Sequence, residues 1–416
     1  MRIPDSFTQR NYLRSLNRTK SSLAEIQYQI ATQSKVNKPS DNPLSNSRIM
    51  RLQNQLKSIQ TYKTNISYGK SMLDNAITSM DSMQTEIENT MEELTKLNSP
   101  VVDNSLESFA TFIDGTIKNL VELANTDFNG QYSFGGAENG SKPFSYDEAS
   151  GKVTVNANHI GGDKEVRISG GIKQKFNISG KELFQSVSAQ TGNLSSNTAV
   201  GDVQTTSSKV YDAKGNEYTL NMNYKKTADN TYELNYTVVD SDSNTIKDET
   251  VTDVKFNSDT GKFEAIGSDT FGEIHVEIPN NKIDFVIDIS RINEKDSATN
   301  LKSTLSQKAD IFNTLIAIRD GLKEGKKPTA EQVQMVTDFH QHVLDKLSKA
   351  GGVYNKLEST EAVLRNRETE VMELLSAEKD VDVSKALIDL QNNQYTLDLT
   401  YKISSMILPK SLMDYL

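Results

Sequence analysis

The sequence predicts an α+β multidomain fold, with a long antiparallel α-helical coiled-coil rod formed by both chain ends and a β-rich outer region inserted between them. Three observations lead to this prediction. Apolar residues recur every three or four positions over both ends of the 416-residue chain. In the middle, apolar residues alternate with polar ones. The hydrophobic fraction, 35%, is low for a single compact globule.

The composition excludes several classes of function. The chain has no cysteine, which rules out disulfides, thiolate metal sites and cysteine nucleophiles. No apolar run approaches the ~18 residues that a membrane helix needs, and the first residues lack the apolar segment of a secretory signal. We therefore expect no membrane insertion, and either a cytoplasmic protein or one exported by a route that does not read such a signal.

Charge is distributed unevenly within a formal net charge of −10. Residues 1–70 hold 12 Lys and Arg against 3 acids, whereas residues 71–127 hold 2 against 11. A basic segment could indicate nucleic-acid binding. Its charges are spread singly along a helical pattern with few aromatic residues, so we expect a solvated or self-pairing helix face and no nucleic acid.

The first long helix is predicted by a heptad pattern between residues 49 and 94. Its inward positions, apolar except for two lysines and a glutamine, are Ile49, Leu52, Leu56, Ile59, Lys63, Ile66, Lys70, Leu73, Ile77, Met80, Gln84, Ile87, Met91 and Leu94. A break at residues 98–100 should end it, and a shorter amphipathic helix should follow over residues 106–124.

The C-terminal third repeats this design. A seam runs from Val336 to Leu375, and a second runs from Val383 to Leu408, with Asp380 or Asp382 as its expected N-cap. The N-terminal counterpart lies within residues 16–30. We predict that these terminal helices mediate assembly through Leu16, Leu23, Ile26, Ile30, Val383, Leu387, Leu390 and Leu397.

Polar residues inside the seams suggest a register. One antiparallel alignment places Lys63 opposite Glu368 and Lys70 opposite Glu361. A separate alignment of the terminal helices places Leu16 opposite Leu397, Leu23 opposite Leu390 and Ile30 opposite Val383. Chance matches among many heptad positions are the alternative explanation.

The middle of the chain predicts β structure. Tyr218, Leu220, Met222 and Tyr224 share one face of a strand, and Tyr232, Leu234, Tyr236 and Val238 share one face of the next. Residues 274–278 and 283–289 form a second expected hairpin, and shorter strands are expected near 152–157 and 165–170. Residues 186–208, rich in Ser, Thr, Asn and Gly, predict a linker or long loop.

No motif supports catalysis. The phosphate-binding, dinucleotide-binding, nucleophile-elbow and zinc-protease patterns do not occur in the sequence. His340 and His342 point to different helix faces. Residues 240–251 imitate a calcium loop, but Thr245 and Val251 replace its glycine and its glutamate. We expect a non-enzymatic protein with no metal and no cofactor, whose seams mediate self-assembly.

Three stretches resemble the flagellin-like axial proteins of the bacterial flagellum. The turn motif Pro39-Ser40-Asp41-Asn42-Pro43 precedes the long helix, as in that family. Residues 127–144, DFNGQYSFGGAENGSKPF, resemble its glycine-rich passage into the outer domain, and residues 380–416 resemble its terminal helix. The segment SKVYDAKGNEYTLNMNYKKTADNTYELNYTV within 208–264 resembles a β domain of the flagellar hook protein, which points to an added outer domain.

This resemblance implies a division of the chain. Residues 1–44 and 378–416 would form terminal helices of an inner tube, and residues 45–145 and 291–377 the helical rod. Residues 146–202 and 267–290 would form a β-rich outer domain, and residues 203–266 the additional hook-protein-like β domain.

The resemblance also implies a structural role at the junction of hook and filament. The expected partners are copies of the chain in a ring, a neighbouring hook-associated protein, flagellin or a second junction protein, and an export chaperone on the C-terminal segment. The protein would be secreted through the flagellar export apparatus and lie in the extracellular flagellum. Filament flagellin is one alternative, and a coiled-coil translocator or needle-tip protein of a related injection system is another.

Overall fold

The computed structural model describes residues 5–97, 106–137, 139–155 and 160–407. Two compact units divide the chain: a terminal unit of residues 1–64 and 361–416, and a central unit of residues 65–360. The helices are α1 (Asp5–Thr32), α2 (Pro43–Lys96), α3 (Leu106–Ala124), α4 (Gly180–Phe184), α5 (Ile311–Lys323), α6 (Ala330–Lys379) and α7 (Val383–Ile407).

All the strands of the described residues lie between α3 and α5 in the central unit. They are β1 (Asp127–Phe128), β2 (Gln131–Tyr132), β3 (Phe144–Asp147), β4 (Lys152–Val155), β5 (Glu165–Ser169), β6 (Ile172–Lys175), β7 (Val187–Leu194), β8 (Val203–Tyr211), β9 (Glu217–Ala228), β10 (Thr231–Val239), β11 (Thr245–Phe256), β12 (Phe263–Ile266), β13 (Glu273–Ile278), β14 (Ile283–Glu294) and β15 (Lys302–Leu305). The chain is therefore α+β, as the sequence predicts.

The expected long helices form. α2 has 54 residues and α6 has 50, and α3 begins at residue 106. The expected break at residues 98–100 lies outside the described residues. Within the central unit, the apolar side chains at the predicted three- and four-residue spacing are buried in one core. This core includes Met80, Ile87, Leu94, Ile113, Ile117, Leu120, Val336 and Val343.

An aromatic cluster joins this helical core to the β structure. The ring of Phe184, at the end of α4, lies with its centroid 5.0 Å from that of Phe144 and 5.3 Å from that of Phe312. Phe134 and Phe339 lie at 5.8 and 6.3 Å. All five side chains are buried. Contacts of this kind stabilise beyond the apolar area that they bury.

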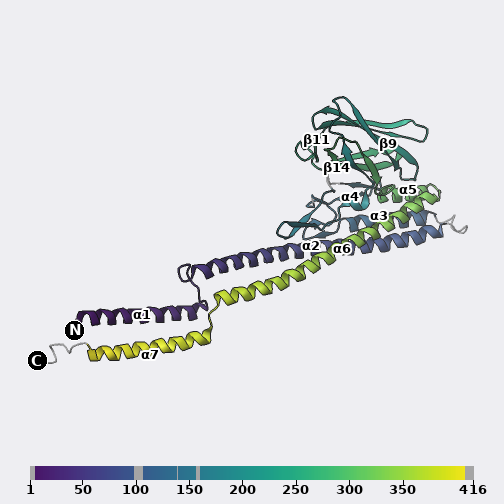
Figure 1. The fold of residues 1–416 in the computed structure, drawn as a ribbon. Coiled ribbons are helices and arrows are strands. Elements are labelled where there is room, and N and C mark those ends of the chain that lie inside the picture. The colour runs from purple at the N-terminus through teal and green to yellow at the C-terminus, as the bar shows by residue number, and fades with distance from the viewer. Residues whose placement is uncertain (1–4, 98–105, 138, 156–159, 408–416) are drawn as a thin grey trace. The chain divides into compact units, whose positions relative to one another are not determined.

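Two packed sheets form the larger part of the β region (Figure 1), and the pairs β1-β2, β3-β4 and β5-β6 form separate two-stranded sheets. The five-stranded sheet has the order β12-β11-β10-β9-β8, and the four-stranded sheet has the order β13-β14-β7-β15. Both predicted hairpins are confirmed: Leu234 pairs with Tyr224 across β10 and β9, and Val276 pairs with Phe285 across β13 and β14. The apolar faces of the two sheets share one core. β4 and β5 occupy the sites of the shorter expected strands, apart from residues 156–157, which lie outside the described residues.

The expected loop at residues 186–208 is wrong. Residues 187–194 form β7, which lies between a parallel β14 and an antiparallel β15, and residues 203–211 form β8. Polar side chains are stable there because they bond to one another. Ser188 Oγ lies 3.1 Å from Ser303 Oγ, and Gln190 Nε2 donates to the same oxygen at 2.7 Å.

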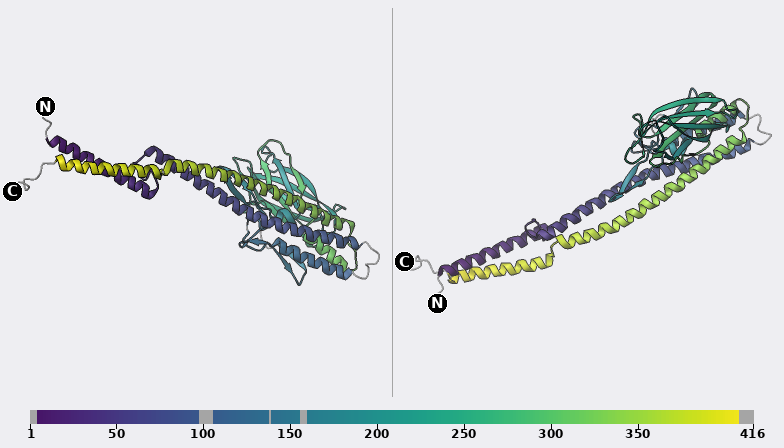
Figure 2. Two further views of the ribbon diagram at one scale, coloured as in Figure 1. Left: turned by 90° about the horizontal axis from the view of Figure 1, so that it is seen from below. Right: turned by 45° about the horizontal axis from the view of Figure 1, so that its top comes forward.

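In the terminal unit, α1 and α7 lie side by side in both views (Figure 2). Asp382 caps α7 by accepting a 3.0 Å hydrogen bond from the Lys385 amide, so the second of the two expected caps is used. None of the helices in the described part of the chain carries an apolar stretch of the length that a bilayer-spanning segment requires.

A titratable cluster connects α5 to the β13–β14 hairpin within the central unit. Asp310 is the N-cap of α5 and accepts from the Asn313 amide at 3.0 Å. Asn313 in turn donates to Asp284, whose other oxygen lies 2.8 Å from His275 Nε2. Burial, and then the neighbouring Asp284 carboxylate, raises the pKa of Asp310 to about 7.

This geometry predicts a pH-dependent contribution of Asp310 to stability. The folded pKa lies above the ordinary value of 3.8, so the folded state holds the proton more tightly and its stability falls as pH rises from about 4 to 7. Asp310→Asn keeps the acceptor oxygen without the charge. The unfolding free energy of wild type relative to this variant should fall by about 1–2 kcal/mol between pH 5 and 7 in urea titrations.

Asp229→Asn, in the exposed turn between β9 and β10, is the control and should show no such trend. A constant difference between wild type and Asp310→Asn over this pH range would contradict the prediction.

Candidate assembly surfaces

The terminal helices place the predicted assembly residues in two environments. Leu16, Leu23, Ile26, Ile30, Leu390 and Leu397 are half-buried within the terminal unit. Val383 and Leu387 are exposed. Tyr12 Oη donates to the Thr400 carbonyl at 3.2 Å, which shows that the N-terminal half of α1 lies against the C-terminal half of α7. Lys20 Nζ also lies 5.7 Å from the centre of the Tyr401 ring.

α7 carries apolar side chains on two opposite faces. The covered face includes Thr400 and the residues Ala386, Leu390, Asn393 and Leu397, spaced by three or four positions. On the other side, Ile388, Tyr395, Leu399 and Ile403 are 59%, 66%, 39% and 48% exposed. We call these four residues the outer stripe. At 100° per residue their mean direction lies about 145° from that of the covered face.

Backbone hydrogen bonds join the end of α1 to the start of α7. The Lys35 amide donates to the Lys379 carbonyl at 2.8 Å, and the Val381 amide donates to the Gln33 carbonyl at 3.2 Å. Ser34 and Asp380 form an antiparallel bridge between them. Gln33 has a φ of 53°, so the chain leaves α1 through a left-handed residue. We call this pairing the connector.

The turn motif at residues 39–43 sets the start of α2. Asp41 Oδ2 accepts from the amides of Lys38 at 2.8 Å and Asn37 at 3.1 Å. Asn42 Oδ1 accepts from the Ser45 amide at 3.0 Å, which makes Asn42 the N-cap. Pro43 is the first helical residue, where a missing N–H costs nothing. Pro39, Ser40, Asp41 and Pro43 are all exposed.

Ion pairs link α2 to α6 in the terminal unit. Lys63 Nζ lies 2.5 Å from Glu368 Oε2, and Arg48 Nη1 lies 3.0 Å from Glu378 Oε1. The hydrogen bond from Lys63 lowers the pKa of Glu368. Both side chains of the Lys63–Glu368 pair are mostly covered. These pairs require an antiparallel arrangement of the two helices within this unit.

The other two register residues belong to different units. In the central unit, Lys70 Nζ lies 4.0 Å from Glu358 Oε1 and 5.1 Å from the centre of the Tyr354 ring. In the terminal unit, Glu361 Oε1 lies 3.1 Å from Arg365 Nη2.

The residues that imitate catalytic or metal sites have structural partners. His340 Nε2 lies 3.1 Å from Glu88 Oε1, whereas His342 Nε2 lies 2.8 Å from the Glu182 carbonyl. Asp240 Oδ1 accepts from the amides of Asp242 and Asn244, which closes the turn between β10 and β11. Among the residues that the structure describes, no group of three or more side chains is placed to bind a metal ion.

Sequence reasoning missed three residues of these surfaces. Ser34 is buried in the connector, where its hydroxyl donates to the Val36 carbonyl at 2.9 Å. Asn42 caps α2, and an Asn-Pro pair before a heptad pattern is a usable signal for such a cap. Ala386 is buried on α7, and its spacing of four from Leu390 was available in the sequence.

Comparison with known protein families finds two matching regions. Residues 5–139 match the bacterial flagellin N-terminal helical region. Residues 177–341 match the flagellar basal body protein FlaE D2 domain. The second region contains β7 to β15, and it begins before and ends after the hook-protein-like segment 203–266 that the sequence predicts.

Two curated relatives match part of the chain. Flagellar hook-associated protein 3 of Escherichia coli (strain K12) is 27% identical over 195 residues, and its counterpart in Salmonella typhimurium (strain LT2) is 25% identical over 199 residues. Each match covers 45% of this chain, and the chain spans 58% of the length of each relative.

Solved structures were also compared. The flagellar junction protein FlgL from Legionella pneumophila is 14% identical, with a TM-score of 0.44 and coverage of 81% of this chain and 100% of that one. FlgL from Xanthomonas campestris is 15% identical, with a TM-score of 0.35 and coverage of 84% and 99%. On the sequence matches, the chain resembles flagellar hook-associated protein 3, and it contains one region that matches the flagellin N-terminal helical region and another that matches the FlaE D2 domain.

Proposed function

We propose that this chain is a structural protein of the bacterial flagellum that forms the junction between hook and filament. The observation that carries the proposal is the combination of a flagellin helical region with similarity to hook-associated protein 3 in one chain. The D2 domain supports an added, hook-like outer segment. The role is non-enzymatic.

The two apolar faces of α7 support self-assembly. A helix that is apolar on opposite sides is stable in water only when both sides are covered. α1 covers one side within the chain. The outer stripe therefore fits against a further helix, and a symmetric assembly supplies that helix from another copy of the same chain.

The lengths and pairing of α2 and α6 support a coiled-coil rod. In this proposal the register places Lys63 opposite Glu368 and Lys70 opposite Glu361. Residues 1–44 and 378–416 form the inner tube, and residues 45–145 and 291–377 form the rod. Residues 146–202 and 267–290 form the outer β domain, with residues 203–266 as the addition. The 2.5 Å pair of Lys63 and Glu368 agrees with this register.

The partners follow from the position in the flagellum. Copies of the chain form a ring between a hook-associated protein on the hook side and flagellin or a second junction protein on the filament side. Export proceeds through the flagellar apparatus, with a chaperone on the C-terminal segment, and the assembled protein is extracellular. Filament flagellin is the second candidate, because the flagellin match covers the N-terminal helices.

Deletion of the gene separates these two roles. A junction protein is needed for filament attachment, so the deletion strain should carry hooks without filaments and shed flagellin into the medium. Electron microscopy of the cell surface, with immunoblots of the medium, provides the measurement. Hooks that still bear filaments would contradict the junction role, and loss of filament subunits from both surface and medium would favour the flagellin alternative.

The outer stripe predicts an assembly-specific variant. Ile388→Asp introduces a charge at an exposed position, so the thermal melt of the monomer should stay within about 1 °C of wild type. Filament attachment in the complemented strain should be lost, because a buried unpaired charge is unfavourable in the assembly. Gln394→Asp adds the same charge at an exposed position of α7 that lies about 100° or more from each outer-stripe residue, and it serves as the matched control. Normal filaments with Ile388→Asp would exclude the stripe as an assembly surface.

The rod register predicts a rescue by charge exchange. Lys63→Glu should destabilise the isolated protein, since it places two carboxylates in contact at Glu368. Adding Glu368→Lys should restore an opposite-charge pair and recover about 0.2–1 kcal/mol in a double-mutant cycle. Lys57→Glu, at an exposed position of α2, is the control for the charge change alone. A coupling energy of zero would rule out this register.

A further inference from the structure

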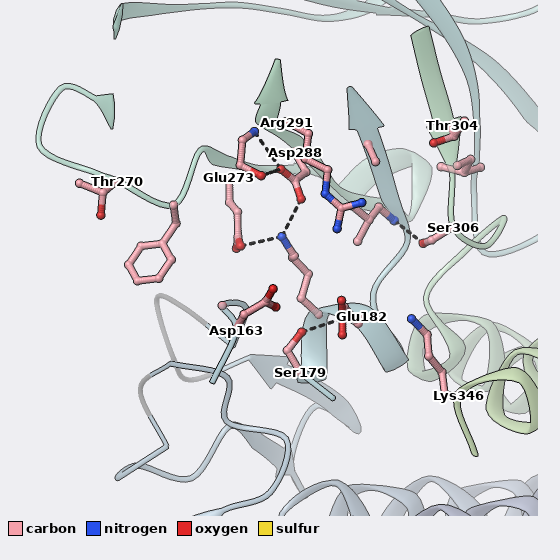
Figure 3. Close-up of a pocket in the computed structure, with 17 residues that line it drawn as sticks. Asp163, Ser179, Glu182, Thr270, Glu273, Asp288, Arg291, Thr304, Ser306 and Lys346 are labelled. Carbon is pink, nitrogen blue, oxygen red and sulfur yellow. Dashed lines mark hydrogen bonds and ion pairs between the residues drawn. The ribbon is translucent and has the colours of Figure 1, made fainter. Parts of the chain in front are cut away.

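A pocket of about 450 Å³ lies in the central unit between β7, β14, α4 and α6 (Figure 3). One wall is fixed by Lys181, whose Nζ lies 2.6 Å from Glu273 Oε1 and 2.9 Å from Asp288 Oδ2. The side chains of Lys181 and Asp288 are only 10% and 7% exposed. Ser290 Oγ donates to the other oxygen of Asp288 at 2.6 Å. The charged groups of this wall therefore have hydrogen-bonding partners, which fix their positions.

The remaining carboxylates of the pocket are paired with a second lysine. Lys175 Nζ lies 2.5 Å from Asp163 Oδ1 and 2.9 Å from Glu182 Oε1. Each acid that lines the pocket is therefore paired with Lys181 or Lys175. These acids are already neutralised in part, which leaves the other charged side chains of the pocket to determine what it attracts.

Two further cations line the pocket, and the acid that attracts one of them, Glu182, is already paired with Lys175. Arg291 on β14 and Lys346 on α6 have no ion pair or hydrogen bond through their side chains among the residues that the structure describes. In the view of Figure 3 the Lys346 ammonium lies below Ser306, and the Arg291 side chain enters the same pocket from β14. Lys346 also borders a second, mostly apolar pocket together with Lys349 and Lys175.

The electrostatics around Lys346 favour an anion. Burial lowers the pKa of Lys346, and the attraction of Glu182 is opposed by Lys349, Lys175 and Arg291. A partly buried ammonium surrounded by more cations than anions is unfavourable unless a counterion is supplied. An anion between the two side chains would supply it, and a guanidinium beside an ammonium offers both a planar fork and a point charge.

We propose that this pocket binds a small oxyanion, the phosphate or carboxylate group of a small molecule, between Arg291 and Lys346. The bound group would bridge β14 of the mixed sheet and α6 of the helical core. Binding would therefore stabilise the central unit by linking its two parts. The inference stands on this pocket alone and is independent of the role in the flagellum.

The test uses the full-length monomer. Inorganic phosphate and succinate are titrated separately by isothermal calorimetry, and thermal melts compare both anions with chloride at equal ionic strength. At least one anion should bind saturably and raise the melting temperature. Arg291→Gln and Lys346→Gln should each weaken that binding by about tenfold, because each removes a charge-assisted contact. Lys225→Gln, at an exposed position of β9, should leave binding unchanged.

Anion-free melts show whether the variants fold. Lys346→Gln should be at least as stable as wild type without phosphate, since it removes a partly buried charge that neighbouring cations oppose. Saturable binding of phosphate alone or succinate alone supports the site and identifies its acidic group. Absence of saturable binding of both anions at about 20 mM, well above the ~1 mM dissociation constant that corresponds to about −4 kcal/mol, would overturn the proposal. Equal affinity in wild type and both pocket variants would overturn it as well.

Discussion

The structure depends first on the connector, the short backbone pairing between residues 33–36 and 379–381. Two peptide hydrogen bonds, which form one antiparallel bridge, hold the end of α1 to the start of α7. Backbone groups in this pairing satisfy one another, so the link does not depend on particular side-chain chemistry. The connector joins segments that are more than 300 residues apart in the sequence. The chain between them therefore forms one long loop that begins and ends at the connector.

Within the chain between these two segments, the helices and the two large sheets have separate hydrophobic cores. The helical core of the central unit buries the apolar faces of α2, α3 and α6, and a second core lies between the two sheets. Phe184 and Phe312 connect the helical core to the segments next to the sheets. A buried ion pair also stabilises the β region: Lys226 Nζ lies 3.0 Å from Glu294 Oε1, which accepts from Tyr232 Oη at 2.9 Å as well.

Sequence patterns predicted what depends on periodicity. The helices and both hairpins follow from spacing, because each apolar stripe must face a core. The segment at 186–208 was missed because its strand stability comes from bonds between Ser188, Gln190 and Ser303, which lie far apart in sequence. The heptad pattern of α7 also placed residues of two different helix faces on a single seam. Val383 and Leu387 fit a heptad, yet Ala386 is the buried residue, since a small side chain permits close approach.

We propose that the two chain ends pair as antiparallel helices in the register of Leu16 with Leu397, which the hydrogen bond from Tyr12 Oη to the Thr400 carbonyl supports. The absence of cysteine makes a direct measurement possible: introduce Leu16→Cys with Leu397→Cys and follow intramolecular disulfide formation in dilute monomer. The pairing predicts rapid closure for this pair and little closure for Leu16→Cys with Ile388→Cys, which lies on the outer stripe. Equal or faster closure of the second pair would contradict it.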